Sequence, residues 1–569
     1  MKNHVVKMMA LVFFTALVVS LSGCGGSSSS PPNSTTGKVS LDVTDAPALE
    51  YAHVYVTVTG VAFHTSSAAG FDSYSTVKNS GWHRTDLSAP QTIDLAQLAN
   101  GVMYGDSNGG SSLFSGLDLP AGRYQQIRIF LASSEDGLTD SAAALNLIYN
   151  NEVVLNGDST HYPLRIPTAD EGIRLIPETP VVVTAGSSAN IVLDFNLNND
   201  VVPVSPNGTK EFILKPRLGY FDMASVGAVK GVVNFGNLST SRFVIKAEQV
   251  KNGANYRIVR RWTGVDKSTG KFNLYPLPVF GNTTTATYDI LLRGRSAQTA
   301  IVKSVKIHKG TTLANGAVDL GTITMQPGTE FSAQLGSALH PTGAWVNFYQ
   351  TIANDTVPYE IRYRHLDPYT GKFSSPEELS TGPIQVATYT SGDPLTFSPD
   401  TTSQGVFSVV ADASGYYGRG SVITGVTGAV GQAVSLNFSS ANAPQITGGA
   451  SSDSISTIFN MSMFGTGKGH GMGMGPLSQL KPNSGQLFVT HGGMIVDSMG
   501  TLTGDTTIGI SMHNGGGLNN AITVDNIPGN VPGAFYGVYG LGWGNGVLAA
   551  GSTRVDLSSG SATAKIKMK

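Results

Sequence analysis

The sequence predicts an all-β protein, made of tandem β-sandwich domains that follow an export signal and a flexible tether. Three observations support this prediction. Apolar and polar residues alternate along many short segments, which is the pattern of strands with one buried face. Turn sequences separate these segments, and the 69 glycines among 569 residues are typical of turn-rich modules. A pattern with Asp, Thr, Gly, Lys and Phe recurs about 100 residues later, the size of one β-sandwich.

Residues 1–23 are expected to be a lipoprotein signal peptide. Lys2 and Lys7 precede an apolar run, 8–19, that is too short to span a bilayer. Leu21-Ser22-Gly23-Cys24 then resembles the lipobox, the cleavage motif of lipoprotein signal peptidase. The alternative is an ordinary secretory signal with a chance cysteine. Because Cys24 is the only cysteine of the chain, we expect cleavage before it and its lipidation with diacylglycerol and palmitate.

The rest of the composition restricts the chemistry of the mature chain. Without a second cysteine, it forms no disulfide, no thiolate metal site and no cysteine nucleophile. A net charge of −2, with 13 % charged residues, argues against a nucleic-acid partner. Residues 24–37 are interpreted as a flexible tether to the membrane. Gly25, rather than Asp, follows the cysteine, which favours the outer membrane, with the body facing the periplasm or the cell surface.

A first β domain is expected over residues 38–222. Its strands alternate apolar and polar residues, with a short helix around 92–100 whose Leu95 and Leu98 point inward. The apolar positions that define its strands are Val39, Leu41 and Val43; Val54, Val56 and Val58; Ile127, Ile129 and Leu131; and Ile191, Leu193, Phe195 and Leu197.

Two β-sandwich modules, 223–327 and 328–440, are expected next, the second repeating the first. The segment from Asp266 to Phe272 recurs as Asp367 to Phe373, with the shared pattern Asp-x-x-Thr-Gly-Lys-Phe. We interpret it as a hairpin in which the Asp side chain binds the turn backbone, Gly takes the left-handed conformation and Phe points inward. A phosphate or calcium site is the weaker interpretation, since a P-loop needs a longer Gly-rich run. Residues 441–569 are expected to form a Gly- and Met-rich C-terminal β domain.

Several motifs of the first domain occur in the order of a known family. They are Thr44-Asp45-Ala46-Pro47, Val56 to Val61, Ile93-Asp94-Leu95, Leu119 to Arg128, Val192-Leu193-Asp194-Phe195 and Leu214-Lys215-Pro216. Over about 37–221 the chain resembles the bacterial lipoprotein-associated family called domain of unknown function 4382. The resemblance implies a fold and a location but no reaction. The family tends to continue Asp-Phe with a second Asp, where this chain has Asn196, so a metal site on that acidic pair would be weakened here.

The later modules are similar to the carboxypeptidase-regulatory and transthyretin-like sandwiches, a group with immunoglobulin-like architecture. The segment 227–233 resembles their opening strand. The segments 270–274 and 288–292 resemble their hairpin pair. This second resemblance implies tandem Ig-like or transthyretin-like folds for the two modules.

The strongest candidate for a functional site is a cluster of Met and His residues near the C-terminus. Thioether and imidazole groups together suit a soft metal such as Cu(I) or Ag(I). The alternative is that these methionines pack in a core and that the Gly run is a loop. The candidate ligands are Met461, Met463, His470, Met472, Met474, His491 and Met494.

Catalytic and sugar-binding interpretations rest on weaker signals. The chain has no Gly-x-Ser-x-Gly elbow and no His-Glu-x-x-His motif, so a hydrolase of cell-surface polymers is the least favoured class. Tryptophans in sandwiches are mostly core residues. Trp82, in a loop-like segment, is the best candidate to stack on a sugar or to contact a partner.

We therefore expect a non-catalytic, lipid-anchored binding, adhesion or scaffold protein outside the cytoplasm, with no cofactor and an unidentified protein or glycan ligand. A copper- or silver-binding lipoprotein is the second hypothesis. A polymer hydrolase is the third.

Overall fold

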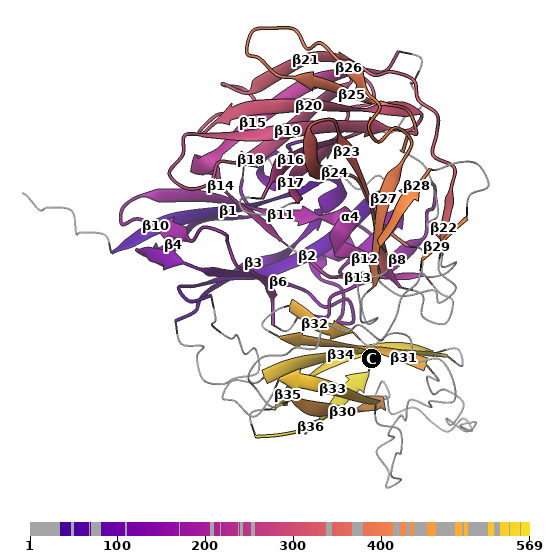
Figure 1. The fold of residues 1–569 in the computed structure, drawn as a ribbon. Coiled ribbons are helices and arrows are strands. Elements are labelled where there is room, and N and C mark those ends of the chain that lie inside the picture. The colour runs from indigo at the N-terminus through magenta and orange to yellow at the C-terminus, as the bar shows by residue number, and fades with distance from the viewer. Residues whose placement is uncertain are drawn as a thin grey trace, which may run out of the picture.

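The computed structural model describes the chain from residue 35 to residue 568 with interruptions (Figure 1). The expected signal peptide and most of the expected tether, including Cys24, lie outside the described residues. The residues left out are 1–34, 47–49, 68, 70–80, 108–110, 170, 205–209, 217, 237, 239–242, 252–255, 337–343, 367–371, 373–378, 414–421, 428–432, 437–451, 462–483, 492–493, 499–521, 529–534, 545–546, 558 and 569.

The all-β prediction is confirmed, and the first domain is a sandwich of two sheets. The smaller sheet has the order β14-β11-β1-β4, in which β1 runs parallel to β11 and antiparallel to β4. The larger sheet has the order β12-β13-β8-β7-β2-β6-β9, with β3 also paired to β2. The strands are β1 (Thr36–Ala46), β2 (Tyr51–His64), β3 (His83–Asp94), β4 (Phe114–Pro120), β6 (Gln126–Leu131), β7 (Glu152–Leu155), β8 (His161–Arg165), β9 (Ile173–Leu175), β11 (Ser188–Asn196), β12 (Val201–Val204), β13 (Glu211–Leu214) and β14 (Gly219–Asp222).

The core between these sheets consists of the residues that alternate in the sequence. On β1, Val39, Leu41 and Val43 are all fully buried. Leu95 and Leu98 point inward as predicted, but the helix is only the 3-10 turn η1 (Leu95–Gln97), because β3 continues to Asp94. The remaining short elements are β5 (Gly122–Tyr124), which pairs with β10 (Val181–Val183), α2 (Tyr104–Ser107), α3 (Asp140–Ala144), α4 (Leu197–Asp200) and η3 (Met223–Ser225).

The second module packs a three-stranded sheet against a larger one. The small sheet has the order β18-β15-β21, and the larger begins with β17-β16-β19-β20. Strands β25 and β26, which follow much later in the chain, complete the larger sheet because β25 pairs in parallel with β20. The bounds are β15 (Val226–Asn234), β16 (Phe243–Val250), β17 (Arg257–Gly264), β18 (Lys271–Pro278), β19 (Thr285–Gly294), β20 (Ala297–His308), β21 (Val318–Thr324), β25 (Ile384–Thr388) and β26 (Ser398–Asp400).

The third module packs on the other face of that same large sheet. Its own sheet has the order β24-β23-β27-β28, beside the short pair β22-β29. Its core includes Leu291 of β19 and Ile301 of β20, whereas Ile290 and Leu292 belong to the core of the second module. The second and third modules therefore share one sheet as a common middle layer. The bounds are β22 (Gln334–Gly336), β23 (Ala344–Ile352), β24 (Asp355–His365), β27 (Phe407–Ala413), β28 (Val422–Val426) and β29 (Ala433–Ser435).

The C-terminal domain has two sheets, of orders β33-β30-β36 and β32-β31-β34-β35. It lies below the first domain in Figure 1, on the side away from the second module. Ile213 of β13 forms one buried cluster with Phe488, Tyr539 and Leu541 of this domain. The bounds are β30 (Ser452–Met461), β31 (Ser484–His491), β32 (Met494–Ser498), β33 (Ile522–Pro528), β34 (Phe535–Gly544), β35 (Val547–Asp556) and β36 (Ala562–Met568).

The first copy of the repeated motif forms the hairpin turn that its sequence predicts. Asp266 Oδ1 accepts hydrogen bonds from the Ser268 and Thr269 backbone amides at 2.9 and 2.8 Å. Gly270 has a φ of +72°, and Phe272 is fully buried. Most of the second copy lies outside the described residues. No helix in the described part of the chain is long and apolar enough to cross a membrane.

Candidate functional site

Two motifs of the first domain meet at the ends of neighbouring strands. In the parallel pairing of β1 with β11, Thr44 lies opposite Asp194, and Asp45 follows at the next position. Helix α4 begins directly after β11, and the Leu197 backbone amide donates to Asp45 Oδ1 at 3.2 Å. Asp45 and Thr44 are both fully buried. Segments about 150 residues apart in sequence thus build one buried polar site.

A guanidinium from the second module fills this site. Arg261 of β17 donates from Nη1 to Asp194 Oδ1. Its Nη2 donates to Thr44 Oγ1 at 2.9 Å and to the Asp45 carbonyl at 3.1 Å. The Arg261 side chain is only 1 % exposed. We call Thr44, Asp45 and Asp194 the Arg261 socket.

The two carboxyl groups of the socket have raised pKa values. Burial raises the pKa of Asp45 well above its ordinary value, and repulsion from Asp194 adds to this effect. Burial also raises the pKa of Asp194, against the opposing attraction of Arg261. Asp45 Oδ2 has no hydrogen-bond partner among the described residues. Arg261 Nη1 donates to the Asp194 carboxylate, whereas Asp45 contacts the guanidinium through its backbone carbonyl, so Asp194 is the carboxyl that pairs with Arg261.

The socket also bears on whether this chain could hold a metal at the acidic pair of the family, where Asn196 replaces the second Asp. Among the described residues, no group of three or more His, Cys, Asp or Glu is arranged to hold a metal ion. In this chain the guanidinium of Arg261 lies against Asp194 and neutralises its charge.

A cavity of about 390 Å³ lies beside the socket, between the first domain and the second module. Arg260 donates to Glu178 at 2.8 Å, and its guanidinium lies 4.5 Å from the centre of the Phe280 ring. Both Asp194 and Arg261 line the cavity, so the socket forms part of its wall. The lining also includes Thr179, Asn196, Tyr220, Phe221 and Trp262.

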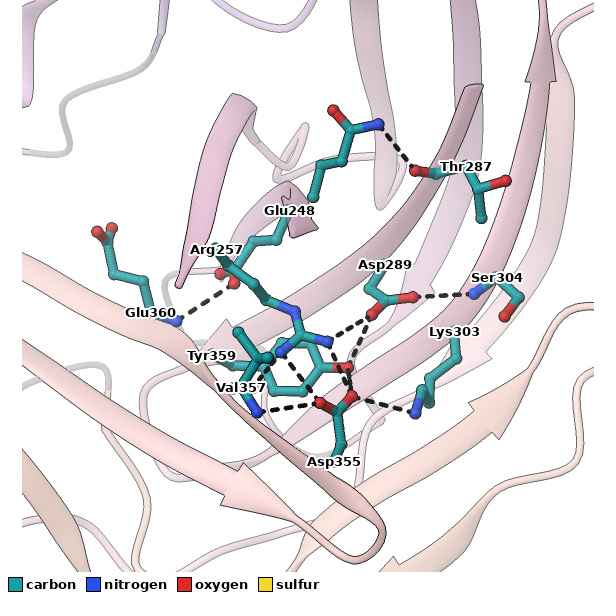
Figure 2. Close-up of polar contacts among 11 residues, drawn as sticks. Glu248, Arg257, Thr287, Asp289, Lys303, Ser304, Asp355, Val357, Tyr359 and Glu360 are labelled. Carbon is teal, nitrogen blue, oxygen red and sulfur yellow. Dashed lines mark hydrogen bonds and ion pairs between the residues drawn. The ribbon is translucent and has the colours of Figure 1, made fainter. Parts of the chain in front are cut away.

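A second charged network joins the second and third modules (Figure 2). Arg257 of β17 donates to Asp355 at 2.8 Å and to Asp289 at 3.1 Å. Lys303 also donates to Asp355, at 3.2 Å. The Tyr359 hydroxyl donates to Asp289 at 2.8 Å, and the Arg257 guanidinium lies 3.6 Å from the centre of the Tyr359 ring. This network ties β17 and the shared sheet to β24.

A buried lysine reinforces the same junction. Lys246 of β16 donates to the Glu360 carboxylate at 2.8 Å and to the Glu360 carbonyl at 2.9 Å. The Glu360 backbone amide donates in turn to Glu248 Oε2 at 3.2 Å. Burial raises the pKa of Glu248 to about 8, although the nearby Lys246 opposes the shift.

A third network joins the C-terminal domain to the first domain. The Tyr539 hydroxyl donates to Glu135 Oε1 at 2.7 Å, and Thr490 donates to Glu171 at 2.7 Å. Arg165 donates to Glu135 at 3.1 Å and pairs with Glu211. These three junctions therefore all contain buried charged side chains with hydrogen-bond partners.

The residues that the sequence singled out are placed as follows. Trp82 is half-buried, with the His64 ring 5.0 Å and the Arg128 guanidinium 5.3 Å from it. Cys24, Met463, His470, Met472 and Met474 lie outside the described residues. Met461, His491 and Met494 lie in β30, β31 and β32, and their side chains are outside the described part.

Two histidines of the first domain pair with carboxylates. His53 Nδ1 lies 2.6 Å from Asp94 Oδ2, and His161 Nδ1 lies 2.5 Å from Glu152 Oε1. These contacts place each imidazole against an acidic side chain of the same domain.

The cations that occupy the junctions were not among the residues predicted from the sequence. Lys246 sits between Ile245 and Ala247 in a strand that is otherwise largely buried, and Arg261 directly precedes Trp262. A cation inside an apolar strand was the available signal, because such a side chain needs a buried partner.

The fold and this site define a modular all-β protein whose domains are linked by buried ion pairs. Residues 36–216 match the family described as Domain of unknown function (DUF4382), so Thr44, Asp45 and Asp194 lie within the matched region. No curated protein matches the chain.

Among solved structures, trypsin-activated alpha-2-macroglobulin from Escherichia coli aligns with this chain. The sequences are 9 % identical, the TM-score is 0.09, and the alignment covers 90 % of this chain. This chain spans 33 % of the length of that structure.

Proposed function

We propose that the protein is a non-catalytic, lipid-anchored binding protein outside the cytoplasm, with its binding site in the cavity between the first domain and the second module. The observation that carries the proposal is the cavity itself, of about 390 Å³, with the Arg261 socket in its wall. Small-molecule sites favour concave places at domain interfaces, where a few polar groups lie among apolar ones.

The junction networks support a site of fixed shape. Arg261 binds the first domain, and Arg257 and Lys246 bind the third module. A pre-organised cavity loses little conformational entropy when a ligand enters, so such a site suits binding. The two arginines of the wall are already paired, Arg261 with Asp194 and Arg260 with Glu178, which supports recognition rather than proton transfer.

Membrane anchoring rests on the lipobox at Cys24 and the tether that follows it. A Cys24→Ala variant is expected to leave the outer-membrane fraction and to lose incorporation of labelled palmitate. Cys24→Ala protein that remains in that fraction, with no palmitate in the parent protein either, would contradict the anchor.

The cavity is tested with the full chain, extracted in detergent. A chemically diverse set of sugars, amino acids, nucleotides and organic acids is screened by thermal shift and titration calorimetry. Thr179 is exposed and lines the cavity, so Thr179→Trp is expected to block binding. Thr184 is exposed in the same domain but does not line the cavity, and Thr184→Trp is the matched control. If no ligand distinguishes the two variants, the cavity is not a binding site.

A further inference from the structure

We infer that the cavity between the first domain and the second module binds a neutral saccharide of one or two rings. This inference rests on the proposed function, because it names the ligand class of the same site. Four properties of the wall carry it: aromatic side chains, balanced charge, polar groups that donate and accept hydrogen bonds, and size.

Aromatic side chains from both domains contribute to the wall. Tyr220 and Phe221 come from β14 of the first domain, and Trp262 and Phe280 come from the second module. Tyr220 and Phe280 are half-buried and can contact a ligand, whereas Phe221 and Trp262 are each only 4 % exposed and mainly pack behind the wall. Flat aromatic faces suit ligands that carry C–H groups on one side and polar groups at their edge. A sugar ring has this character, whereas an aliphatic chain has no polar edge.

The charges of the wall are almost balanced and are already paired. Arg261 binds Asp194, and Arg260 binds Glu178. Asp222 is the remaining carboxylate of the lining, and it binds the Ala224 amide and the Ser225 hydroxyl. An anionic ligand would have to break one of these ion pairs or remain unpaired itself, and both are costly in a partly buried site. A cationic ligand would find only Asp222, whose oxygens already accept two hydrogen bonds. A neutral ligand avoids this cost.

Polar side chains that donate and accept hydrogen bonds also line the cavity. Thr179 and Tyr220 contribute hydroxyls, and Asn196 contributes an amide. A hydroxyl group both donates and accepts, so a ligand rich in hydroxyls matches this mixture better than a ligand with only acceptors.

The size of the cavity limits the ligand. Its volume of about 390 Å³ is near the lower end of the ~300–1,000 Å³ range of small-molecule sites. This space suits one or two sugar rings, so the site would recognise a short oligosaccharide or the end of a longer chain.

The test uses the detergent-extracted full chain and a panel of defined sugars. N-acetylglucosamine, glucose, galactose, mannose, maltose and cellobiose are the neutral probes. Glucuronate and glucosamine are the charged analogues. Saturation-transfer NMR and calorimetry are expected to show binding of at least one neutral sugar, at least tenfold tighter than its charged analogue. Thr179→Trp is expected to abolish this binding, and Thr184→Trp to retain it.

A second pair of variants tests the aromatic contact without blocking the cavity. Phe280→Ala is expected to weaken sugar binding at least fivefold, and Phe280→Tyr to retain it. Circular dichroism and thermal unfolding show whether each variant is folded. Sugar binding that survives Thr179→Trp lies elsewhere and overturns the inference.

The remaining outcomes separate the two proposals. One outcome is that amino acids, nucleotides or organic acids bind the parent protein, that Thr179→Trp abolishes this binding, and that neutral sugars do not bind. The saccharide inference then fails while the proposed binding function stands. If no compound shows binding that Thr179→Trp abolishes, the proposed binding site and the saccharide inference both fail.

Discussion

The guanidinium of Arg261 and the carboxylate of Asp194 form a buried ion pair between two domains, across 67 residues of sequence. The Arg261 side chain is 1 % exposed and that of Asp194 is 13 % exposed. Asp194 lies next to Phe195 of the first-domain core, so this pair links the packing of one domain to the position of the next. Arg261 and its neighbour Arg260, which pairs with Glu178, are thus the two cations of β17 that join the second module to the first domain.

Removal of Arg261 is expected to destabilise the protein strongly. Arg261→Ala leaves the Asp194 carboxylate without its cation and the Asp45 carbonyl without its donor, which costs about 3–5 kcal/mol for a broken buried pair. Arg261→Lys keeps the charge but loses the forked hydrogen bonds, so an intermediate loss is expected. Urea unfolding measures both effects. Arg295 is 45 % exposed and pairs with Glu330, so Arg295→Ala is the control, with a loss of about 0–1 kcal/mol. Equal losses for the two alanine variants would contradict the role of the socket.

Glu248 is expected to make the stability of the protein depend on pH. Its pKa rises from 4.5 to about 8 on burial. Between these values the unfolded chain has released the proton and the folded chain retains it, so stability falls as pH rises through this window. Below pH 4.5 both states hold the proton, and the contribution of Glu248 is then constant.

Glu248→Gln is expected to remove this contribution. The slope that disappears is at most about 1.4 kcal/mol per pH unit for one group. Unfolding free energies measured from about pH 4 to about pH 9 give the difference between variant and parent. Asp118 is 60 % exposed and pairs with Lys38, so Asp118→Asn should leave the slope across the Glu248 window unchanged. A parent slope that persists in Glu248→Gln would show that other groups cause it.

The docking of the C-terminal domain is expected to depend on Tyr539. Its hydroxyl donates to Glu135, which also accepts from Arg165, and the ring is 2 % exposed. Tyr539→Phe removes a hydrogen bond to a charged group, worth about 1.5–3 kcal/mol. Faster hydrogen exchange in β31 and β8 is the expected readout. Tyr256 is 45 % exposed, and Tyr256→Phe should leave exchange in both strands unchanged.

The hairpin turn at Asp266 requires Gly270 for two separate reasons. Its φ is +72°, and an added Cβ would lie 2.2 Å from the Val233 carbonyl oxygen. Gly310 has a φ of +79° but nothing within 4 Å of an added Cβ. Gly310→Ala is therefore expected to cost about 1–2 kcal/mol, from backbone strain alone. Gly270→Ala is expected to cost clearly more in the same thermal unfolding assay. Equal costs would show that the contact with Val233 relaxes freely.

Periodicity and turn chemistry were sufficient to predict the all-β class, the first-domain strands β1, β2, β6 and β11, and the Asp266 turn. These features follow from local rules, since strand alternation and turn geometry involve residues only a few positions apart. Val39, Leu41 and Val43 alternate in the sequence and are buried together on β1. The motif residues Thr44 and Asp194 were also visible in the sequence, although nothing local indicated that they meet.

The way in which the domains join follows from tertiary packing and could not be predicted from the chain. Ile290, Leu291 and Leu292 form a continuous apolar run, and the structure shows why, since the sheet is buried on both faces between two modules. The partners of Arg261, Arg257 and Lys246 lie far away in sequence or across a domain boundary. A buried cation needs a buried partner, and the packing of the sheets decides which residue that is. Strand periodicity involves residues only a few positions apart, so it does not reveal a partner that lies far away in sequence. The cavity beside Arg261 has the same origin, because two separate domains form its wall.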